Sequence, residues 1–178
     1  MSNLTADGTL NTIGSGAGPF CFDLGVDAGS KVFAGSLCTQ LTATGMIVPY
    51  STASAGAVVG VAQHAADNSA VGAADGDKRV RIETKRCYAF TNGAGAEAFS
   101  EASLIGSVVY GTDDNTVADN SATQTRKPVG FFMGMEADGA VRVFVDPPLA
   151  FIAAALSGLA DAPATADALR DALVLALG

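Results

Sequence analysis

Short apolar runs separated by turn-forming residues make up most of the chain between residues 20 and 146. The clearest example is residues 58–83, where an apolar run leads into a loop rich in Asp, Asn, Gly and Ser. After that loop, Val80 and Ile82 alternate with charged residues. Apolar residues at every second position place one side of a strand in a core and leave the other in solvent. The pattern therefore predicts paired β-strands in a compact domain.

The same criteria predict strands along the whole of this region, at 21–24, 31–33, 37–41, 46–49, 58–62, 79–83, 88–90, 107–110, 116–118, 129–135 and 140–145. Asp138-Gly139 is a strong hairpin signal between the last two. In the final strand, Val141, Val143 and Val145 predict one buried face. Short strands without helical segments between them predict a mainly β fold, a compact antiparallel sandwich or barrel, rather than βαβ units.

The two ends of the chain differ from this region. Residues 1–19 are rich in Gly, Ser, Thr and Asn and predict a flexible N-terminal arm. Pro147-Pro148 ends the β domain of residues 20–146, because proline cannot donate to a strand ladder. Residues 147–178 then predict a helical tail, with one helix following the prolines and a second after Thr165.

The tail carries an apolar stripe at helical spacing, and short helices are marginally stable alone. The tail must therefore pack on the β domain, on its own partner helix or on another subunit. We expect the stripe to take part in self-association; the alternative is that the helices only cover one end of their own β domain. The stripe consists of Leu149, Ile152, Leu156, Leu169, Leu173 and Leu177.

Composition narrows the possible functions. The 178 residues carry a net charge of −8, which argues against a nucleic-acid-binding protein. Only 16% of residues are charged, so much of the surface is small and weakly polar and suits contact with other subunits. No apolar run reaches the ~18 residues of a membrane span, and the N-terminus lacks the basic and apolar regions of a signal peptide, so neither is expected.

Candidate catalytic and metal-binding residues are few. His64 is the single histidine and follows a predicted strand, so we expect a surface residue rather than a base. Cys21, Cys38 and Cys87 have no CxxC spacing, which predicts reduced thiols rather than disulfides or a zinc site. Residues 14–18 (GSGAG) lack the strand and helix of a dinucleotide loop.

Several aspartates are candidates for calcium binding, but none matches the spacing of an EF-hand. We therefore expect them to be turn residues whose carboxylates accept backbone amides. We predict no catalytic residue, cofactor or metal site. The aspartates considered are Asp75, Asp77, Asp113, Asp114 and Asp119.

An ordered series of segments resembles a known family. The segments are AGSKVFAGSL (28–37), VVGVA (58–62), DNS (67–69), GAADGDKRVRIE (72–83), CYAFTN (87–92), IGSVVYGTDDNTVA (105–118) and a VGFFMG…DGAVRVFV hairpin (129–145). Over residues 20–146 this series is similar to the head-decoration, or capsid cement, proteins of tailed bacteriophages. The helical tail departs from the compact members of that family.

The resemblance implies a β-rich protein that is made in the host cytoplasm and assembles as a small oligomer, most often a trimer. It implies binding to the major capsid protein on the outer surface of the virion, without catalytic residues. Decoration proteins commonly join the capsid with an N-terminal arm, which here gives Leu4, Leu10, Ile13 and Phe20 as contact residues. A basic cluster at Lys78, Arg79 and Arg81, extended by Lys85 and Arg86, is either a solvated strand face or a further contact.

Two other classes of function stay open. One is another virion component, such as a tail-tube or head–tail connector protein, in which the tail helices mediate ring assembly. The other is a capsid-associated hydrolase or a lectin-like glycan binder. A single histidine and the lack of tryptophan argue against both members of this last class, because sugar sites usually need aromatic stacking platforms.

Overall fold

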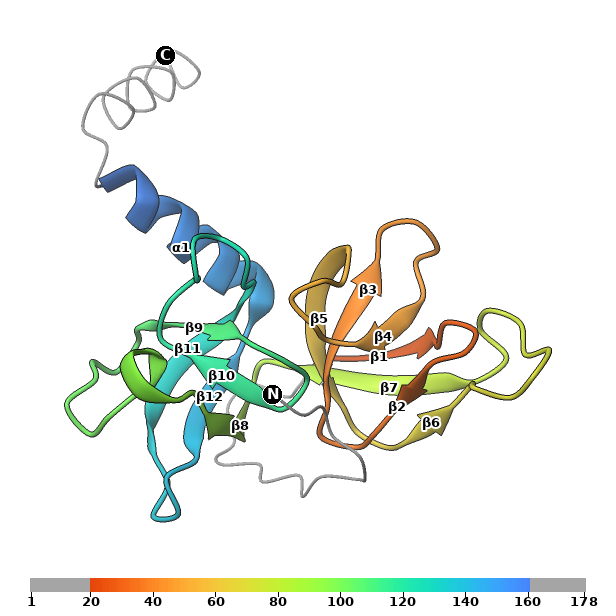
Figure 1. The fold of residues 1–178 in the computed structure, drawn as a ribbon, viewed down its shortest axis with the longest axis horizontal. Helices are drawn as coiled ribbons and strands as arrows, with labels where there is room; N and C mark the ends of the chain where they lie inside the picture. The colour runs from red at the N-terminus through yellow and green to blue at the C-terminus, as the bar shows by residue number, and fades with distance from the viewer. Residues whose placement is uncertain (1–19, 161–178) are drawn as a thin grey trace, which may run out of the picture.

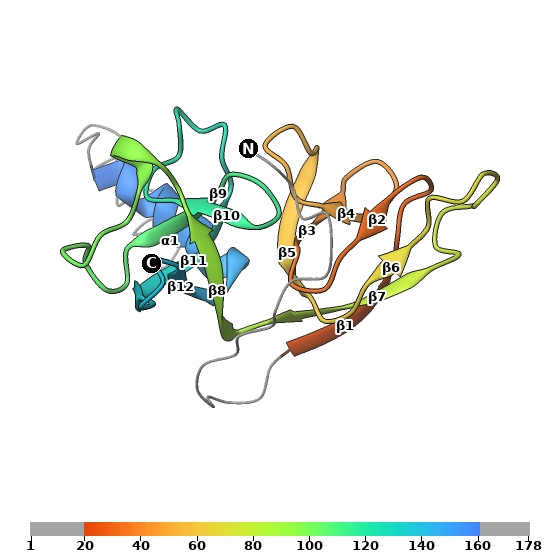
Figure 2. The same ribbon diagram turned by 60° about the horizontal axis from the view of Figure 1, so that its bottom comes forward.

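The computed structural model describes residues 20–160, which form twelve strands, one 3-10 helix and one α-helix. These elements make two β lobes side by side, with the α-helix over the second lobe (Figures 1 and 2). The predicted arm of residues 1–19 and the second predicted helix lie outside the described residues. So do Leu4, Leu10, Ile13, Leu169, Leu173 and Leu177.

The first lobe, here the N-lobe, is an antiparallel sheet in the strand order β1-β7-β5-β3-β4, with a two-stranded ribbon of β2 and β6 beside it. In β7, Val80 and Ile82 are buried while Arg79 and Arg81 are exposed, as the alternation predicts. The bounds are β1 Phe20–Gly25, β2 Lys31–Val32, β3 Leu37–Leu41, β4 Ile47–Pro49, β5 Gly56–Ala62, β6 Ala66–Asp67 and β7 Arg79–Thr84.

The second lobe, here the C-lobe, is a closed barrel in the order β10-β8-β12-β11-β9. Val141, Val143 and Val145 point into its core, as predicted, and are fully buried. The bounds are β8 Arg86–Asn92, the 3-10 helix η1 Gly95–Glu97, β9 Val108–Gly111, β10 Thr116–Ala118, β11 Pro128–Met135 and β12 Val141–Val145.

The two lobes repeat one topology. Written from β8, the order of the C-lobe is β8-β12-β11-β9-β10, which matches β1-β7-β5-β3-β4 strand for strand. Each lobe is closed by a parallel contact at the equivalent place. Val26, directly after β1, bridges Ile47 in the N-lobe, and Asn92 at the end of β8 pairs with Val117 in the C-lobe.

The repeat extends to hydrogen bonds and turns. The amide of Gly35 donates to the carbonyl of Ala62 at 2.8 Å, and the amide of Gly106 donates to the carbonyl of Phe132 at 2.8 Å. Both glycines have a φ of 88°, a backbone conformation that residues with a side chain rarely adopt. A register shift interrupts the β3–β5 and β9–β11 pairs at matching positions. The two lobes therefore share a local design and not only a strand order.

A close approach between strands also recurs. A Cβ atom added at Gly60 would lie 2.4 Å from the carbonyl oxygen of Glu83, and one added at Gly130 would lie 2.0 Å from that of Phe144. Both distances are far shorter than a carbon–oxygen contact allows, so each lobe needs glycine where this strand crosses its neighbour.

The lobes share a core. Side chains on the inner side of the N-lobe, such as Cys38 and Ala62, form one cluster. Other residues of β3 and β5, together with the tyrosine that follows β4, belong instead to the core cluster of the C-lobe; they are Leu37, Tyr50, Val58 and Val61. Hydrogen bonds support this seam, because the Leu37 amide donates to the Asp114 carbonyl at 2.7 Å and the Ser36 hydroxyl to the Asp114 carboxylate at 3.0 Å.

Helix α1 runs over Pro147–Ala160 and packs on β11 and β9 of the C-lobe. It begins directly after β12, because the two prolines are compatible with a first helical turn but not with a strand. Asp146 precedes it, and its carbonyl accepts the amide of Ala150 at 2.9 Å. The prediction of a helix after the prolines is confirmed.

The mainly β fold predicted from the sequence is confirmed. Each predicted strand is present, with ends that move by up to two residues. The two-residue strand β6 and the 3-10 helix were not predicted, because neither is long enough to show a period. The repeat of the two lobes was not predicted either.

Candidate interaction surface

The large apolar side chains of α1 face away from the lobe that the helix covers. Leu149, Phe151, Ile152 and Leu156 are between 50% and 65% exposed, whereas Ala150 is fully buried. The helix thus rests on the C-lobe through its small residues. No residue from 147 to 160 is charged, so the exposed side offers almost no polar group to water.

The orientation of α1 shows where part of the predicted apolar stripe lies. Leu149, Ile152 and Leu156, the members of the stripe within the described residues, lie on the exposed side of α1. The helix does pack on its own β domain, as the alternative has it, but these three side chains stay half exposed or more. A contiguous apolar patch of this kind marks an interaction site on many soluble proteins.

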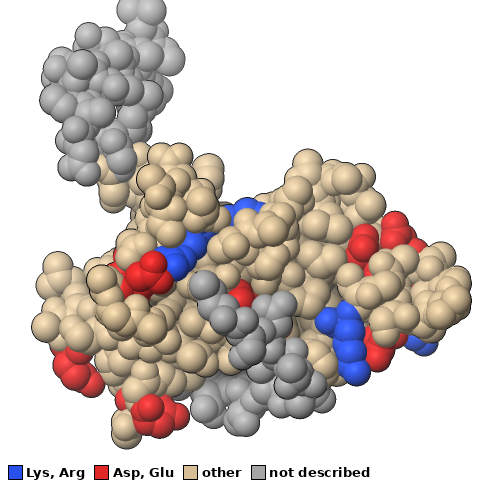
Figure 3. Space-filling view, viewed as in Figure 1, with Lys and Arg blue, Asp and Glu red and all other residues tan. Residues whose placement is uncertain are grey.

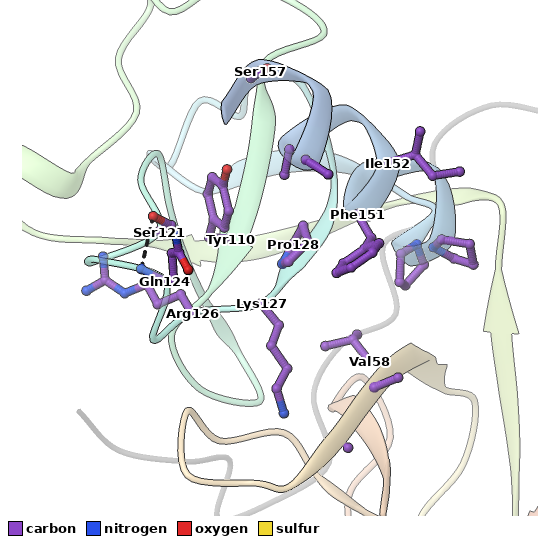
Figure 4. A pocket seen from close by; sticks show the side chains of 16 residues that line it. Val58, Tyr110, Ser121, Gln124, Arg126, Lys127, Pro128, Phe151, Ile152 and Ser157 are labelled. Atoms are coloured by element: carbon purple, nitrogen blue, oxygen red, sulfur yellow. Dashed lines mark hydrogen bonds between the residues drawn. The ribbon is translucent and has the colours of Figure 1, made fainter. Parts of the chain in front are cut away.

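A groove lies beneath α1, where the helix, the start of β5 and the loop between β10 and β11 meet. Its volume is about 1170 Å³. In Figure 4, Phe151 on α1 and Val58 on β5 face each other across it, and Pro128 lies to one side of Phe151. The helix and β5 make the apolar sides of the groove, and the β10–β11 loop makes a polar one.

Lys127 brings positive charge into the groove. Its Nζ donates to the carbonyl of Ser54 and lies 5.9 Å from the centre of the Tyr50 ring. Partial burial lowers the pKa of Lys127, because the charged form loses hydration. Figure 3 shows Lys and Arg atoms below the helix, with Asp or Glu atoms directly beside part of them. The groove therefore joins apolar walls to a polar wall that carries the amine of Lys127.

The polar wall has an unusual backbone. Ala122, Thr123 and Gln124 all have positive φ, at 45°, 59° and 69°. For residues other than glycine this left-handed conformation costs roughly 1–2 kcal/mol each. Three such residues in a row persist only when their surroundings hold them, and such strain often accompanies a functional surface.

Arg126 holds this loop in place. The side chain is 6% exposed; one guanidinium nitrogen lies 2.6 Å from a carboxylate oxygen of Glu97, and another donates to Asn120 Oδ1 at 3.0 Å. The loop is thereby tied to η1 of the same lobe. Sequence reasoning missed the groove and this loop, because Ala-Thr-Gln carries none of the Gly or Asn signals of left-handed backbone.

The predicted capsid-contact residues of the N-lobe fall on two different faces. Directly opposed residues of an antiparallel pair share a face, and Phe20 is opposite Thr84 while Asp23 is opposite Arg81. Phe20 is 54% exposed and lies 4.6 Å from the Lys85 ammonium. Arg79 and Arg81 lie on the other face of this ribbon.

Part of the basic cluster makes contacts on its own face. Arg79 donates to the backbone carbonyl of Asp23, which pairs with Arg81 across the ribbon. Lys78 is exposed at the end of the preceding loop. The structure thus brings Arg79 and Arg81 together but does not place them beside Phe20.

The remaining candidates behave as structural residues. His64 is exposed, with Nε2 3.4 Å from the carbonyl oxygen of Arg79. The three cysteines form no disulfide. Asp75 and Asp77 accept the backbone amides of Ala28 and Ala74 at 2.9 and 2.8 Å, as predicted for turn residues. Within residues 20–160, no group of three or more His, Cys, Asp or Glu side chains is arranged to hold a metal ion.

Asp113 and Asp114 lie in the β9–β10 turn at the seam between the lobes, and both are nearly fully buried. Asp113 accepts the amide of Asn115 at 2.9 Å, so it too supports its turn. Asp119 accepts the side-chain amide of Asn120 at 2.8 Å.

No protein-family model, curated protein or solved structure matches this chain. Among the residues that the structure describes, no helix has the length and apolar character needed to cross a membrane.

Proposed function

We propose that this protein is a structural component of a phage virion that decorates and stabilises the outer surface of the capsid by binding the major capsid protein. The observation that carries the proposal is the outer strand β1 of the N-lobe, whose exposed Phe20 and Phe22 suit contact with another protein. An uncharged helix that turns Leu149, Ile152 and Leu156 outward, with Phe151 over the groove, also suits a contact between subunits. The ordered resemblance to capsid cement proteins supports the same conclusion.

The rest of the architecture supports a structural role. The two lobes share a core cluster, and a single residue, Lys85, separates β7 from β8. The protein therefore presents its surfaces at a set distance from one another. A rigid subunit of this kind stabilises a lattice by making several weak contacts at once, and their combined strength exceeds that of any one contact.

For the capsid contact we favour the outer strand β1. Within residues 20–160, β1 pairs with β7 alone, apart from the bridge that follows it at Val26. No other described strand lies along its second edge, where a strand of another protein could be added. Phe20 and Phe22, at 54% and 44% exposed, provide apolar contacts along that edge.

The test is co-sedimentation with expanded, undecorated heads built from the major capsid protein of the same phage. Wild-type protein is expected to saturate a fixed number of sites. Phe20→Asp with Phe22→Asp should weaken binding by at least about tenfold, which corresponds to about 1.4 kcal/mol. Val71→Asp, which changes a fully exposed apolar residue elsewhere in the N-lobe, should bind like wild type.

If wild-type protein does not sediment with the heads, the capsid proposal is wrong. If it binds and the β1 variant binds equally well, the capsid contact lies elsewhere, and the face of Lys78, Arg79 and Arg81 is the next candidate.

A second candidate function, a tail-tube or head–tail connector protein, is favoured by one observation. The uncharged helix α1 would suit repeated contacts around a ring. Electron microscopy of the purified protein separates the two, because a connector or tube protein forms rings or tubes and a cement protein forms small oligomers.

A further inference from the structure

We propose that the exposed side of α1 is a self-association surface on which the α1 helix of a second copy packs, helix against helix. This goes beyond the proposed function and does not depend on it, since it concerns the protein in the absence of capsids. Three features carry it: the spacing of the apolar residues, their charge environment and the repeat of the two lobes.

The spacing of the apolar residues along α1 selects a helix as the occupant. Leu149, Ile152, Leu156 and Leu159 follow one another at intervals of three, four and three residues. This is the spacing of core positions in a left-handed coiled coil, where side chains of one helix enter holes on the other. The first three are half exposed or more.

Small residues beside the stripe suit the same kind of packing. Ala155 on the exposed side and Ala153 at its margin separate the large side chains, so a second helix can approach the α1 backbone closely. Ala155 is exposed, and Ala153 is partly buried.

The charge distribution selects a second copy of the chain. Each copy carries a net charge of −8, so two copies repel each other over most of their surfaces. The fourteen residues of α1 contain no charge, which makes this a face where two copies meet without like-charge contacts. A strongly charged partner would find no opposite charge on the helix itself.

The repeat of the lobes supports the inference independently. The C-lobe covers the outer side of β3 and β5 in the N-lobe, and α1 covers the outer side of the equivalent strands, β9 and β11, in the C-lobe. Each unit along the chain thus buries the apolar outer face of the unit before it. Among the described elements, α1 is the last of this series, and its own outer face is the one left exposed.

The contact between two α1 helices alone is too small for a stable complex. A helix of fourteen residues is about 21 Å long. A pair of such helices buries less than the roughly 800 Å² per partner that is usual in a stable complex. We therefore infer that the second copy also reaches the mouth of the groove, where Phe151 is 65% exposed.

The test measures mass in solution by sedimentation equilibrium and light scattering, with the full chain and without heads. Wild-type protein should have a concentration-dependent mass at a multiple of 17.7 kDa. Ile152→Asp with Leu156→Asp should shift it to a single chain and raise the dissociation constant at least about 100-fold. Val71→Asp is the matched control and should retain the wild-type mass.

A second measurement avoids reliance on charged variants. Ile152 lies near the middle of α1, so in the Ile152→Cys variant it meets its counterpart whether the two helices run parallel or antiparallel. In a background with Cys21→Ser and Cys87→Ser, mild oxidation should give a disulfide-linked dimer, and Val71→Cys should not.

The proposal is overturned if wild-type protein is a single chain up to about 100 μM, or if the double aspartate variant keeps the wild-type mass while folded. A single-chain wild type would assign the exposed side of α1 to residues 161–178 of the same chain or to another protein. An Ile152→Cys/Leu173→Cys variant separates these two, because an intramolecular disulfide identifies the chain's own segment.

Discussion

The phenol of Tyr50 in the N-lobe donates a hydrogen bond to the carbonyl oxygen of Gly111 in the C-lobe, at 3.0 Å. The phenol oxygen also accepts the backbone amide of Lys127 at 3.1 Å. Tyr50 is fully buried, and burial raises the pKa of its phenol. One side chain thus satisfies two backbone groups of the neighbouring lobe.

Tyr50→Phe should lower the free energy of unfolding by about 1–3 kcal/mol, because it leaves a carbonyl and an amide in the seam without their partner. Urea denaturation followed by circular dichroism measures the change. Tyr110→Phe, which alters a half-buried tyrosine on the outside of the C-lobe, should cost less than about 0.5 kcal/mol. Equal effects of the two substitutions would contradict the role of the Tyr50 phenol.

Gly60→Ala and Gly130→Ala should each destabilise the protein by more than about 2 kcal/mol, because the added methyl group would overlap a backbone carbonyl of the next strand. Since the lobes share a core cluster, each variant should lower the stability of both lobes in one transition. Calorimetry checks this, and two separate transitions in either variant would show that the lobes unfold independently.

The thiol of Cys38 should be unreactive in the folded protein. It is fully buried, and burial raises its pKa well above the ordinary value of 9.0, so the reactive thiolate is scarce. Burial also raises the pKa of Cys87, to a smaller extent. At pH 8, a thiol reagent should detect fewer than three thiols in native protein and all three in guanidinium chloride.

Cys38→Ala is the control for this assignment and should leave the native thiol count unchanged. Rapid reaction of all three thiols without denaturant would show that the core of the N-lobe opens readily.

The carboxyl group of Asp67 should titrate near pH 2. The hydroxyl of Ser69 lies 2.5 Å from its Oδ1, the Ser69 amide also donates to it, and Lys31 lies 3.1 Å away, so the pKa falls from 3.8 to about 2. A depressed carboxyl pKa contributes stability that is present above about pH 4 and is lost as the pH falls towards 2.

Nuclear magnetic resonance titration of the Asp67 carboxyl carbon measures this pKa. Because the Ser69 hydroxyl is the largest cause of the shift, Ser69→Ala should raise the pKa more than Lys31→Gln does. The reverse order would mean that the ion pair, and not the turn, holds the carboxylate.

Much of the fold was predictable because strand alternation is a local signal. Val141, Val143 and Val145 alternate with half-exposed residues, and Asp138-Gly139 marks the turn before them. The repeat of the lobes was hidden, because equivalent positions share apolar character but rarely identity. Ile47 and Val117 close the two lobes in the same way, yet they belong to segments that look unrelated.

The interaction surface was only half predictable. The apolar spacing of α1 is visible in the sequence, but a helix with no charged residue gives no sign of which side is buried. The choice depends on the fit of Ala150 against the C-lobe, which is a tertiary property. The groove is lined by residues from three separate segments of the chain. One of them, the β10–β11 loop, has a left-handed backbone that its residue types do not predict.

The pairing of Phe20 with Thr84 has a mechanical consequence. A pulling force applied at Phe20 is transmitted to the C-lobe through Thr84, the last residue of β7. Because these two residues are paired, the force acts on both strands at the same end of the β1–β7 ladder. The six residue pairs of that ladder would then separate successively, like a zipper, rather than resist together in shear. Under tension applied between Phe20 and the C-lobe, β1 should yield first and at low force, and the barrel beyond it would stay intact.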